Sequence, residues 1–374
     1  MGYAADMKKK VLVITGTRAE YGILRSTMDA IRTHAELELK LLATGMHTQK
    51  KYGETVHEIE TDGYQIDCIV PIPDGTDMLG SLAREIEGMR DYCAKEEPDC
   101  ILVLGDRDEM LAGAIVGTHL NIPVAHIHGG DVSGGIDDSV RNAITKFAQI
   151  HFPATKSAAE RLKAMGVASA SIFEVGTPVV DMIASEKMLS REAVAEKLNL
   201  DSKRDWLTFV LHPLAFDPTP LEDQIRSALG ALESFPEHEK IVLYPNSDSG
   251  SDIFLKPIQS LSGDRYHIFP SLPRTLYMSA VKESVALVGN SSAGVIETAY
   301  LGTPSVNIGG RQKGRERGPS VIDANYEKGG IVAAIHEAID MKAKQSGKPF
   351  PSPYGAPGAG KRIAKILETH LQSK

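Results

Sequence analysis

The fold of this chain is most constrained by short apolar runs that show no polar alternation. Ile101–Leu104 ends abruptly in Gly105-Asp106-Arg107-Asp108, and Val124–Ile127 ends in His128-Gly129-Gly130-Asp131. Continuous apolar runs of this kind are typical of parallel strands that helices cover on both faces. Ligands of such sheets bind just beyond the carboxyl ends of the strands. The acids, arginine and histidine at these two ends therefore predict an active site at one edge of a parallel sheet.

A unit of strand, turn and helix recurs along the whole chain, which indicates βαβ units and parallel sheets. In the first half, strands are predicted at Val11–Thr15, Leu39–Ala43, Ile66–Ile72, Ile101–Leu104, Val124–Ile127, Ile150–Phe152 and Ser171–Val175. The rhythm stops after Pro178 and then restarts, with strands predicted at Trp206–Leu211, Lys240–Tyr244, Val285–Val288 and Ser305–Ile308.

A chain of 374 residues exceeds what one ordinary hydrophobic core supports, so two domains are expected. We predict an α/β fold of two Rossmann-like, doubly wound domains that face a cleft. The N-terminal domain is expected to span residues 7–180 and the C-terminal domain residues 181–352. An amphipathic helix over residues 358–372 is expected to pack back on the N-terminal domain.

Composition and charge exclude several classes of protein. The formal net charge of -8 argues against binding to nucleic acid or to an anionic membrane. No apolar run is long enough to span a membrane and no secretory signal opens the sequence, so we expect a cytoplasmic protein. Cys68, Cys93 and Cys100 are odd in number and lack metal-ligand spacing. They are predicted to be buried free thiols in a reducing compartment.

Two loops of the second half carry groups that suit a diphosphate. Gly289–Gly294 contains Ser291 and Ser292 between a predicted strand and a predicted helix, where hydroxyls, N–H groups and the helix dipole favour an anion. The alternative is a serine that only caps the helix. Gly309–Arg317 holds four cations, and Arg311 suits phosphate oxygens, although a solvated basic loop remains the alternative. Arg18, at the end of the first predicted strand, is either a further phosphate contact or an ordinary surface arginine.

The acidic groups after the two opening strands are candidates for proton transfer. Asp106 is predicted to be a catalytic carboxylate that the adjacent Arg107 keeps ionised. Asp137 and Asp138 are either N-caps of a helix over residues 139–147 or groups for acid–base catalysis. His212 ends the first strand of the second half, where it is either a cleft residue or a satisfied loop histidine.

Two further kinds of site are not expected. Asp106 and Asp108 diverge once a helix begins, and His126 and His128 point to opposite faces of a strand, so no metal is expected. The segment Gly355–Lys361 nearly spells a phosphate-binding P-loop. Arg362 stands where Ser or Thr would bind magnesium, and no strand precedes the segment, so it is predicted to be a linker entering a helix.

Taken in order, these motifs resemble the hydrolysing branch of the UDP-N-acetylglucosamine 2-epimerase family, over nearly the whole chain. They are TGTRAEYG, TGMH, GDRDEMLA, HIHGGDVSGGIDDSVRNAITK, LHP, PNSDSGS, GNSSAGVIE and GGRQKGRE. The resemblance implies a glycosyltransferase-B-like fold, an active site between the domains, a homodimer, and no metal or redox cofactor. It also implies the conversion of UDP-N-acetylglucosamine and water into N-acetylmannosamine and UDP, by elimination to 2-acetamidoglucal and rehydration, for sialic acid-type synthesis.

The resemblance also implies roles for individual residues. Asp106 and Asp137 match catalytic carboxylates, and His212 matches a histidine that assists the departing phosphate or transfers protons. The remaining matches are substrate contacts, on the sugar, the phosphates or the nucleoside: Arg18, His47, Arg107, Asn246, Ser291, Ser292, Glu297 and Arg311.

One departure from the family pattern leaves the substrate open. His128 stands where many family members have a catalytic Glu, so either His128 or Asp131 transfers the proton, or the chain acts on a different sugar. UDP-2,4-diacetamido-2,4,6-trideoxyglucose is the second candidate for the hydrolysed substrate. Three rival functions are a non-hydrolysing epimerase, a retaining glycosyltransferase with an acceptor site, and a nucleotide-sugar-binding regulator without catalysis.

Overall fold

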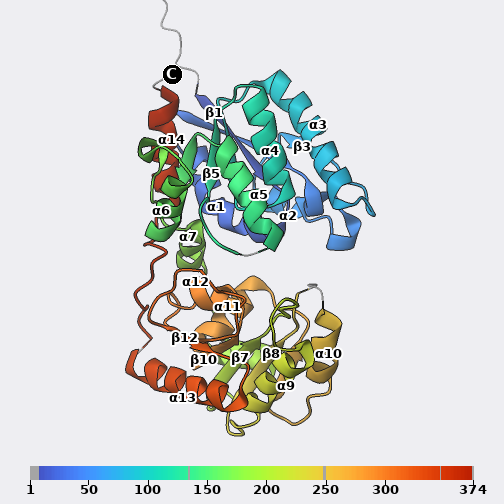
Figure 1. Cartoon of the computed structure of the whole chain (residues 1–374), viewed down its shortest axis with the longest axis vertical. Coiled ribbons are helices and arrows are strands. Elements are labelled where there is room, and N and C mark those ends of the chain that lie inside the picture. Colours follow the sequence, from blue (N-terminus) through green and yellow to red (C-terminus); the bar gives the residue numbers. More distant parts are fainter. Residues whose placement is uncertain (1–7, 134, 247–249, 346, 373–374) are drawn as a thin grey trace, which may run out of the picture. The chain divides into compact units, whose positions relative to one another are not determined.

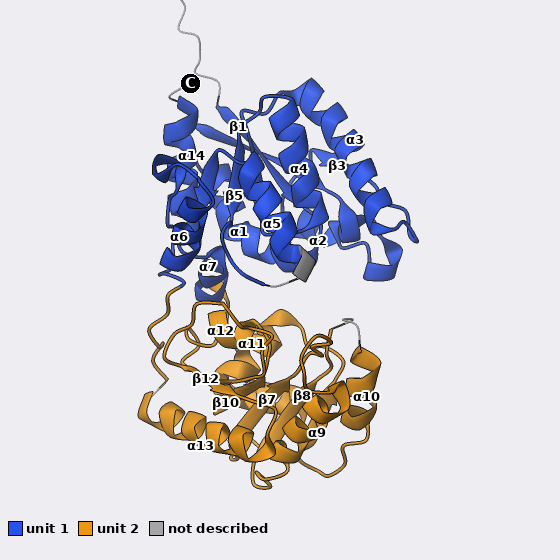
Figure 2. Ribbon diagram, in the orientation of Figure 1, with its two compact units in different colours: residues 1–184, 354–374 blue, residues 185–353 orange. Residues whose placement is uncertain are grey.

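The computed structural model describes residues 8–133, 135–246, 250–345 and 347–372. The chain divides into two compact units, which Figure 2 colours separately. Unit 1 comprises residues 1–184 and 354–374, and unit 2 comprises residues 185–353. Among the described residues, no helix is both long and apolar enough to cross a membrane.

Unit 1 is built on a six-stranded parallel sheet in the order β3-β2-β1-β4-β5-β6. Figure 1 labels β1, β3 and β5 of this sheet and several of the helices of unit 1. The strands are β1 Lys9–Thr15, β2 Leu37–Ala43, β3 Cys68–Ile69, β4 Cys100–Leu104, β5 Val124–Ile127 and β6 Ile150–Phe152. The helices are α1 Arg18–Arg32, α2 Val56–Thr61, α3 Met78–Glu96, α4 Asp108–His119, α5 Gly135–Phe147, α6 Lys156–Ala164, α7 Pro178–Ser185 and α14 Ala359–Gln372, with short 3₁₀ turns at Gly45–Thr48, Lys50–Tyr52 and Ser169–Ser171.

Unit 2 repeats this plan with the order β12-β11-β10-β7-β8-β9. Its strands are β7 Trp206–Val210, β8 Glu239–Leu243, β9 Tyr266–Phe269, β10 Ala286–Gly289, β11 Ser305–Ile308 and β12 Val321–Ala324. Its helices are α8 Arg191–Leu198, α9 Leu221–Leu232, α10 Ser251–Gln259, α11 Arg274–Glu283, α12 Ala293–Ile296 and α13 Lys328–Gln345. The predicted fold class, α/β with two doubly wound parallel sheets, is confirmed.

The apolar runs are buried because helices cover both faces of each sheet. In β1, Val11 and Val13 belong to a core formed with α1 and α14. Leu12 and Ile14 point to the opposite face, into a core formed with α3, α4 and α5. Successive strand residues thus serve two cores, which explains the lack of polar alternation in the sequence.

The last helix of the chain, α14, packs against α1 in unit 1. Asp181 of α7 accepts hydrogen bonds from the backbone N–H groups of Gly358, Ala359 and Gly360, at the N-terminus of α14. A carboxylate of the chain itself thus occupies the N–H groups that a P-loop would offer to phosphate. The prediction that this glycine-rich segment is a linker entering a helix is confirmed.

The structure corrects several predicted elements. The predicted strand Ser171–Val175 is wrong: its pairing is a single bridge between Ile172 and His151, beside the edge strand β6. The predicted strand Ile66–Ile72 shortens to the two residues of β3. The strands β9 and β12 were not predicted, and each forms an edge of the second sheet. The three cysteines are free, with Cys93 and Cys100 buried as predicted, whereas Cys68 is only half-buried.

Candidate active site

The carboxyl edge of the sheet in unit 1 gathers most of the predicted acid–base residues. The chain leaves β1 toward β2 on one side and later returns to β4 on the other, so β1 and β4 flank a topological switch point. Open α/β sheets bind their ligands in the crevice at such a point. Asp106 follows β4 at this edge, and His128 follows β5.

Asp106 belongs to a network centred on Arg141 of α5. The Arg141 guanidinium donates to the Asp106 carboxylate and to Asp138 Oδ1, the latter at 2.7 Å. It also donates to the Asp131 carbonyl at 2.9 Å and to the Ser133 hydroxyl at 2.7 Å. Arg141 is 4% exposed, so these charge-assisted bonds are shielded from water and hold the loop after β5 against the end of β4.

The prediction that Arg107 pairs with Asp106 is wrong. Its Nε donates to Glu109 Oε1 at 2.6 Å rather than to Asp106, and Arg141 provides the cation beside Asp106. The reason is local: Asp106 precedes α4, while Glu109 lies in the first turn of that helix and turns back toward Arg107.

The first turn of α5 carries two aspartates with different surroundings. The helix begins at Gly135, so Asp137 and Asp138 are first-turn residues and not N-caps of a helix over 139–147. Asp137 is exposed. Asp138 accepts hydrogen bonds from Ser133 N at 2.8 Å and from Arg141, which gives it a role in shaping the loop.

The two histidines near β5 differ in accessibility. His126 is fully buried between the Gly105 carbonyl, 2.8 Å from Nε2, and Thr145 Oγ1, 3.2 Å from Nδ1. Burial lowers the pKa of His126 to about 3, so it is a neutral structural residue. His128 is half-buried, with Nε2 placed 2.9 Å from Thr177 Oγ1. Its φ of 64° lies in the left-handed region, which is uncommon outside glycine.

Arg18 and His47 lie at the ends of β1 and β2. Arg18 begins α1, is largely exposed and forms an ion pair with Glu58 at 2.9 Å. The His47 ring is fully buried, with Thr15 Oγ1 at 3.0 Å from Nε2 and Thr55 Oγ1 at 2.7 Å from Nδ1. Burial lowers the pKa of His47 to about 4, so its ring is neutral near pH 7. Whether either side chain contacts substrate stays a prediction.

The carboxyl edge of the sheet in unit 2 is organised by Asn290, which is 1% exposed. Its side chain accepts from His212 N at 2.7 Å and donates to the His212 carbonyl at 2.8 Å. Its own carbonyl accepts from Arg311 Nη1 at 3.3 Å and from Gln312 Nε2 at 2.8 Å. One residue, through its side-chain amide and its backbone carbonyl, thus ties together the loops that follow β7, β10 and β11.

Gly289 allows this arrangement because no other residue fits its position. Its φ is +140°, and a Cβ built on it would lie 1.8 Å from the Val210 carbonyl oxygen of the neighbouring strand. The close approach lets Asn290 N donate to that same carbonyl at 3.1 Å. The glycine therefore sets where the Asn290 amide emerges from β10.

The imidazole of His212 has a defined tautomer. The backbone N–H of Asn246 donates to His212 Nδ1 at 3.1 Å, so Nδ1 carries no proton. In the neutral ring the proton is then on Nε2, which makes Nε2 a hydrogen-bond donor. Asn246 itself is exposed. The predicted residues His212 and Asn246 are therefore in direct contact.

The serine turn after β10 is less helical than the sequence suggested. The helix α12 has only four residues, so the dipole expected for an anion is that of a single turn. Ser292 makes no side-chain capping bond, whereas Ser291 Oγ accepts from Ala293 N at 3.3 Å. The helix-capping alternative therefore does not account for Ser292.

Glu297 follows α12 with one carboxylate oxygen buried and lacking a hydrogen-bond partner among the described residues. The nearest cation is Arg274 of α11, whose Nη2 lies 3.5 Å from Oε2. Burial raises the pKa of Glu297, and the Arg274 charge opposes that rise. An acceptor oxygen in this state suits a ligand that donates hydroxyl groups.

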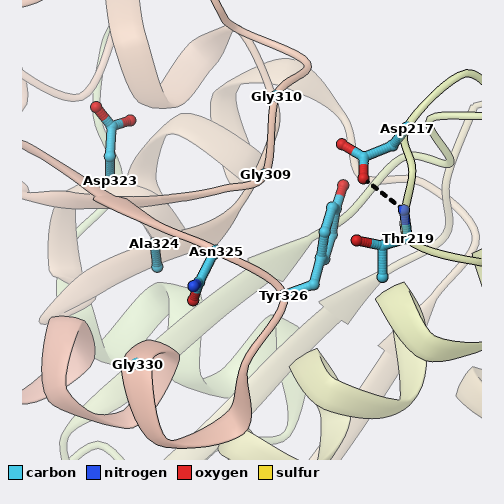
Figure 3. A pocket seen from close by; sticks show the side chains of 9 residues that line it. All are labelled: Asp217, Thr219, Gly309, Gly310, Asp323, Ala324, Asn325, Tyr326 and Gly330. Atoms are coloured by element: carbon cyan, nitrogen blue, oxygen red, sulfur yellow. Dashed lines mark hydrogen bonds between the residues drawn. The ribbon is translucent and has the colours of Figure 1, made fainter.

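A pocket of about 630 Å³ opens in unit 2 beside the ends of β11 and β12 (Figure 3). Its described lining includes two carboxylates and no Lys, Arg or His side chain, so it disfavours a diphosphate. Its wall ends at Gly310, next to Arg311, but none of the predicted site residues that the structure describes lines it. The lining residues are Asp217, Thr219, Gly309, Gly310, Asp323, Ala324, Asn325, Tyr326 and Gly330.

Sequence reasoning missed three residues that organise these edges. Asn290 was noted only as part of the glycine-serine turn, and Arg141 only as part of a longer motif, so neither was assigned a role. Arg274 follows an unpredicted strand, so nothing placed it near Glu297. For Arg141, the available signal was a cation one helical turn after Asp137, on the same face of a predicted helix.

Comparison with known proteins identifies the family. The model of the UDP-N-acetylglucosamine 2-epimerase family matches residues 29–368. The chain belongs to this family. It is 34% identical to the UDP-N,N'-diacetylbacillosamine 2-epimerase (hydrolyzing) of Legionella pneumophila, over 97% of this chain and 96% of the relative. It is 33% identical to the polysialic acid biosynthesis protein P7 of Escherichia coli, over 98% of this chain and 95% of the relative.

A solved structure supports the fold of this epimerase-family chain. The UDP-GlcNAc 2-epimerase of Neisseria meningitidis bound to UDP-GlcNAc matches with a TM-score of 0.80, over 96% of this chain and 100% of that chain. The identity is 17%, so this likeness concerns the fold alone. The glycosyltransferase-B-like fold expected for an epimerase of this family is thereby confirmed.

Proposed function

We propose that this epimerase-family chain hydrolyses UDP-N-acetylglucosamine, with inversion at C2, to N-acetylmannosamine and UDP. Membership of the family supports the nucleotide sugar as substrate, and the hydrolysing relative in Legionella supports the use of water. The observation that carries the proposal is the polar edge of each sheet. Unit 1 offers carboxylates held by a buried arginine, and unit 2 offers neutral donors and a cation.

Unit 1 is proposed to move the protons at C2 of the sugar. Removal of the C2 proton and cleavage of the bond between C1 and the phosphate oxygen give 2-acetamidoglucal and UDP. Water then delivers a proton to C2 and hydroxide to C1. We assign the carboxylate roles to Asp106 and Asp137, with Asp131 and His128 as further proton-transfer residues. The Arg141 guanidinium stabilises the charged form of Asp106, as a base requires.

Unit 2 is proposed to hold the UDP group and to stabilise it as it leaves. His212 Nε2–H donates to a phosphate oxygen, because its Nδ1 is already occupied by Asn246 N–H. The Ser291 and Ser292 hydroxyls and the Arg311 guanidinium bind the remaining diphosphate oxygens. The buried Oε2 of Glu297, which pairs with Arg274 by charge but accepts no hydrogen bond from a described residue, accepts from the ribose hydroxyls.

Incubation with UDP-N-acetylglucosamine in ¹⁸O-labelled heavy water tests the reaction. We expect free N-acetylmannosamine with deuterium at C2 and ¹⁸O at C1, and UDP without the label, because the C1–O bond breaks. A product that still carries UDP would identify a non-hydrolysing epimerase instead. Turnover that appears only after an acceptor sugar is added would identify a glycosyltransferase, and binding without turnover a regulator.

A second substrate has a specific observation in its favour. The Legionella relative is named for UDP-N,N'-diacetylbacillosamine and matches nearly the full length of this chain. Measuring kcat/KM for that compound and for UDP-N-acetylglucosamine shows which of them is the preferred substrate. A preference of more than about tenfold, or 1.4 kcal/mol of transition-state binding, would assign the sugar. The sialic acid-type pathway and the homodimer stay predictions.

A further inference from the structure

A cluster of buried glutamates at the switch point of unit 1 is unexplained by the proposed chemistry. Glu20 of α1, Glu85 of α3 and Glu109 of α4 are 5%, 1% and 2% exposed. Glutamates are rarely buried so completely unless they are paired. The cation in this cluster is Arg107, whose Nε lies 2.6 Å from Glu109 Oε1 and 3.9 Å from Glu20 Oε2.

Glu109 reaches this position because Gly16 has no side chain. A Cβ built on Gly16 would lie 2.1 Å from Glu109 Oε1 and 2.4 Å from its carboxyl carbon. The carboxylate from α4 therefore packs directly on the backbone at the end of β1. This close approach fixes Glu109 between two neighbouring strands, where a longer residue at position 16 would displace it.

Glu20 is held just as firmly on the other side. It accepts hydrogen bonds from Thr15 Oγ1 at 2.8 Å, Thr17 N at 3.0 Å and Thr17 Oγ1 at 2.7 Å. With Thr17 as N-cap, the pair forms a capping box at the start of α1. Neither Glu20 nor Glu109 is free to move, so together they define where the Arg107 guanidinium lies.

Arg107 is only partly covered by these contacts. Its side chain is 45% exposed, whereas those of Glu109 and Glu20 are 3% and 6% exposed. Its Nη2 lies 3.8 Å from Met46 Sδ, a weak acceptor, and its Nη1 makes no hydrogen bond with a described residue. The buried side of the guanidinium is anchored, and the other side faces outward.

We propose that Glu109, supported by Glu20, is a positioning residue that orients the outward N–H groups of Arg107 toward the diphosphate of the substrate. The inference rests on the proposed function, because it requires a nucleotide diphosphate as ligand. An arginine fixed by a buried carboxylate loses less side-chain entropy on binding phosphate than a free one does. Glu109 therefore acts on affinity through Arg107 without touching the ligand.

The test compares UDP binding by calorimetry and steady-state kinetics in Glu109→Gln, Arg107→Ala and the double variant of the full chain. We expect Glu109→Gln to raise both the Kd for UDP and the KM for the UDP-sugar about tenfold, with kcat within about threefold. In the Arg107→Ala background the same change should have no further effect, since the residue through which Glu109 acts is gone. Glu87→Gln, which breaks an exposed Glu–Arg pair on α3, is the matched control.

A purely structural role predicts a different pattern. In one case Glu109→Gln would lower the thermal midpoint and leave the Kd for UDP unchanged. In the other, the fold-changes in Kd caused by Glu109→Gln and Arg107→Ala would multiply in the double variant. Either result overturns the proposal. Glu109→Asp, which keeps the charge but is too short to reach Arg107, should resemble Glu109→Gln in UDP affinity. If the wild-type chain binds no UDP, the proposed function fails as well. If it binds UDP and Glu109→Gln binds equally well, only the positioning role fails.

Discussion

The carboxyl edges of the two sheets differ in the groups that hold their loops together. In unit 1 the edge is crowded with ionisable side chains: Asp106 and Asp138 share Arg141, while Glu20 and Glu109 share Arg107. In unit 2 the corresponding loops are tied by a single neutral amide, Asn290, and by backbone groups.

The difference matches the work that each edge is proposed to do. Proton transfer needs carboxylates whose charge is set by close partners, and burial makes those partners effective. A leaving diphosphate brings its own negative charge, so N–H and O–H donors and a cation stabilise it, and few buried acids should lie beside it. We therefore expect changes in the Asp106–Arg141 network of unit 1 to act on kcat, and changes in unit 2 to act on nucleotide affinity. Glu109 and Arg107 are the proposed exception in unit 1, since they act on nucleotide affinity as well.

The largest effect is expected for Asp106→Asn. The amide keeps the size of the side chain but cannot take a proton, so kcat should fall by about 10³-fold, within the range of general acid–base catalysis. UDP affinity should stay within about twofold. Single-turnover UDP release and calorimetry measure the two quantities. Asp99→Asn, which breaks an ion pair with Lys9 at the opposite end of β4, is the control. Unchanged UDP release would remove Asp106 from the chemistry.

The next effect concerns stability and its dependence on pH. Burial, with a further contribution from Glu109, raises the pKa of Glu85 to about 8 from an ordinary value of 4.5, with Asp108 also raising it and Arg107 and Thr44 opposing. The folded state therefore holds a proton that the unfolded state releases, and stability falls as pH rises from about 5 to 8.

Glu85→Gln keeps the neutral form at every pH. Relative to the wild type, the variant should gain on the order of 3 kcal/mol of unfolding free energy between pH 5 and pH 8. Urea unfolding followed by circular dichroism at both pH values measures this difference. Glu87→Gln, exposed on the same helix, should show no such gain. Parallel stability curves for Glu85→Gln and the wild type would show that Glu85 is not buried as a neutral acid.

The fold could be predicted from the sequence where strands are buried on both faces. The run Val11–Thr15 coincides with the end of β1 because two cores enclose it. The edge strands β9 and β12 escaped prediction because their residues are only half-buried or exposed, so their sequences lack a continuous apolar run. The domain boundaries at residues 180 and 352 stay predictions.

The position of the site could be predicted from the sequence, but the hydrogen bonds and ion pairs within it could not. Strand ends pointed to Asp106 and His212, because carboxyl ends of parallel strands share one edge. The partner of Asp106 is Arg141, 35 residues away on α5, and proximity in sequence wrongly favoured Arg107. The choice between two nearby cations depends on the direction of the helix and the path of the loop. The spacing of residues along a short segment predicts neither.

In unit 2, Asn290→Ala should weaken the edge as a whole. The change leaves the backbone N–H and C=O of His212 without their partners, at a cost of about 2 kcal/mol in stability. Since the loop then moves, UDP affinity should fall about tenfold. Asn290→Asp is the sharper variant, because it retains the acceptor for His212 N but cannot donate to the His212 carbonyl. Thermal midpoints and UDP calorimetry distinguish the variants. If Asn290→Ala bound UDP as tightly as the wild type, Asn290 would not organise a nucleotide site at this edge.

The smallest effect is expected for Glu297→Gln, and it tests whether an acid belongs at the neutral edge. If the buried oxygen of Glu297 accepts from the ribose, Gln still offers a neutral acceptor, so UDP binding should weaken only about fivefold. This is the difference of about 1 kcal/mol between a charged and a neutral hydrogen bond. The same change should leave the affinity for 2′,3′-dideoxyuridine diphosphate nearly unaltered, because that nucleotide has no hydroxyl to donate. Calorimetry with both nucleotides gives the answer. Equal losses for the two would mean that Glu297 acts by orienting Arg274, and unit 2 would then share the charge-pair design of unit 1.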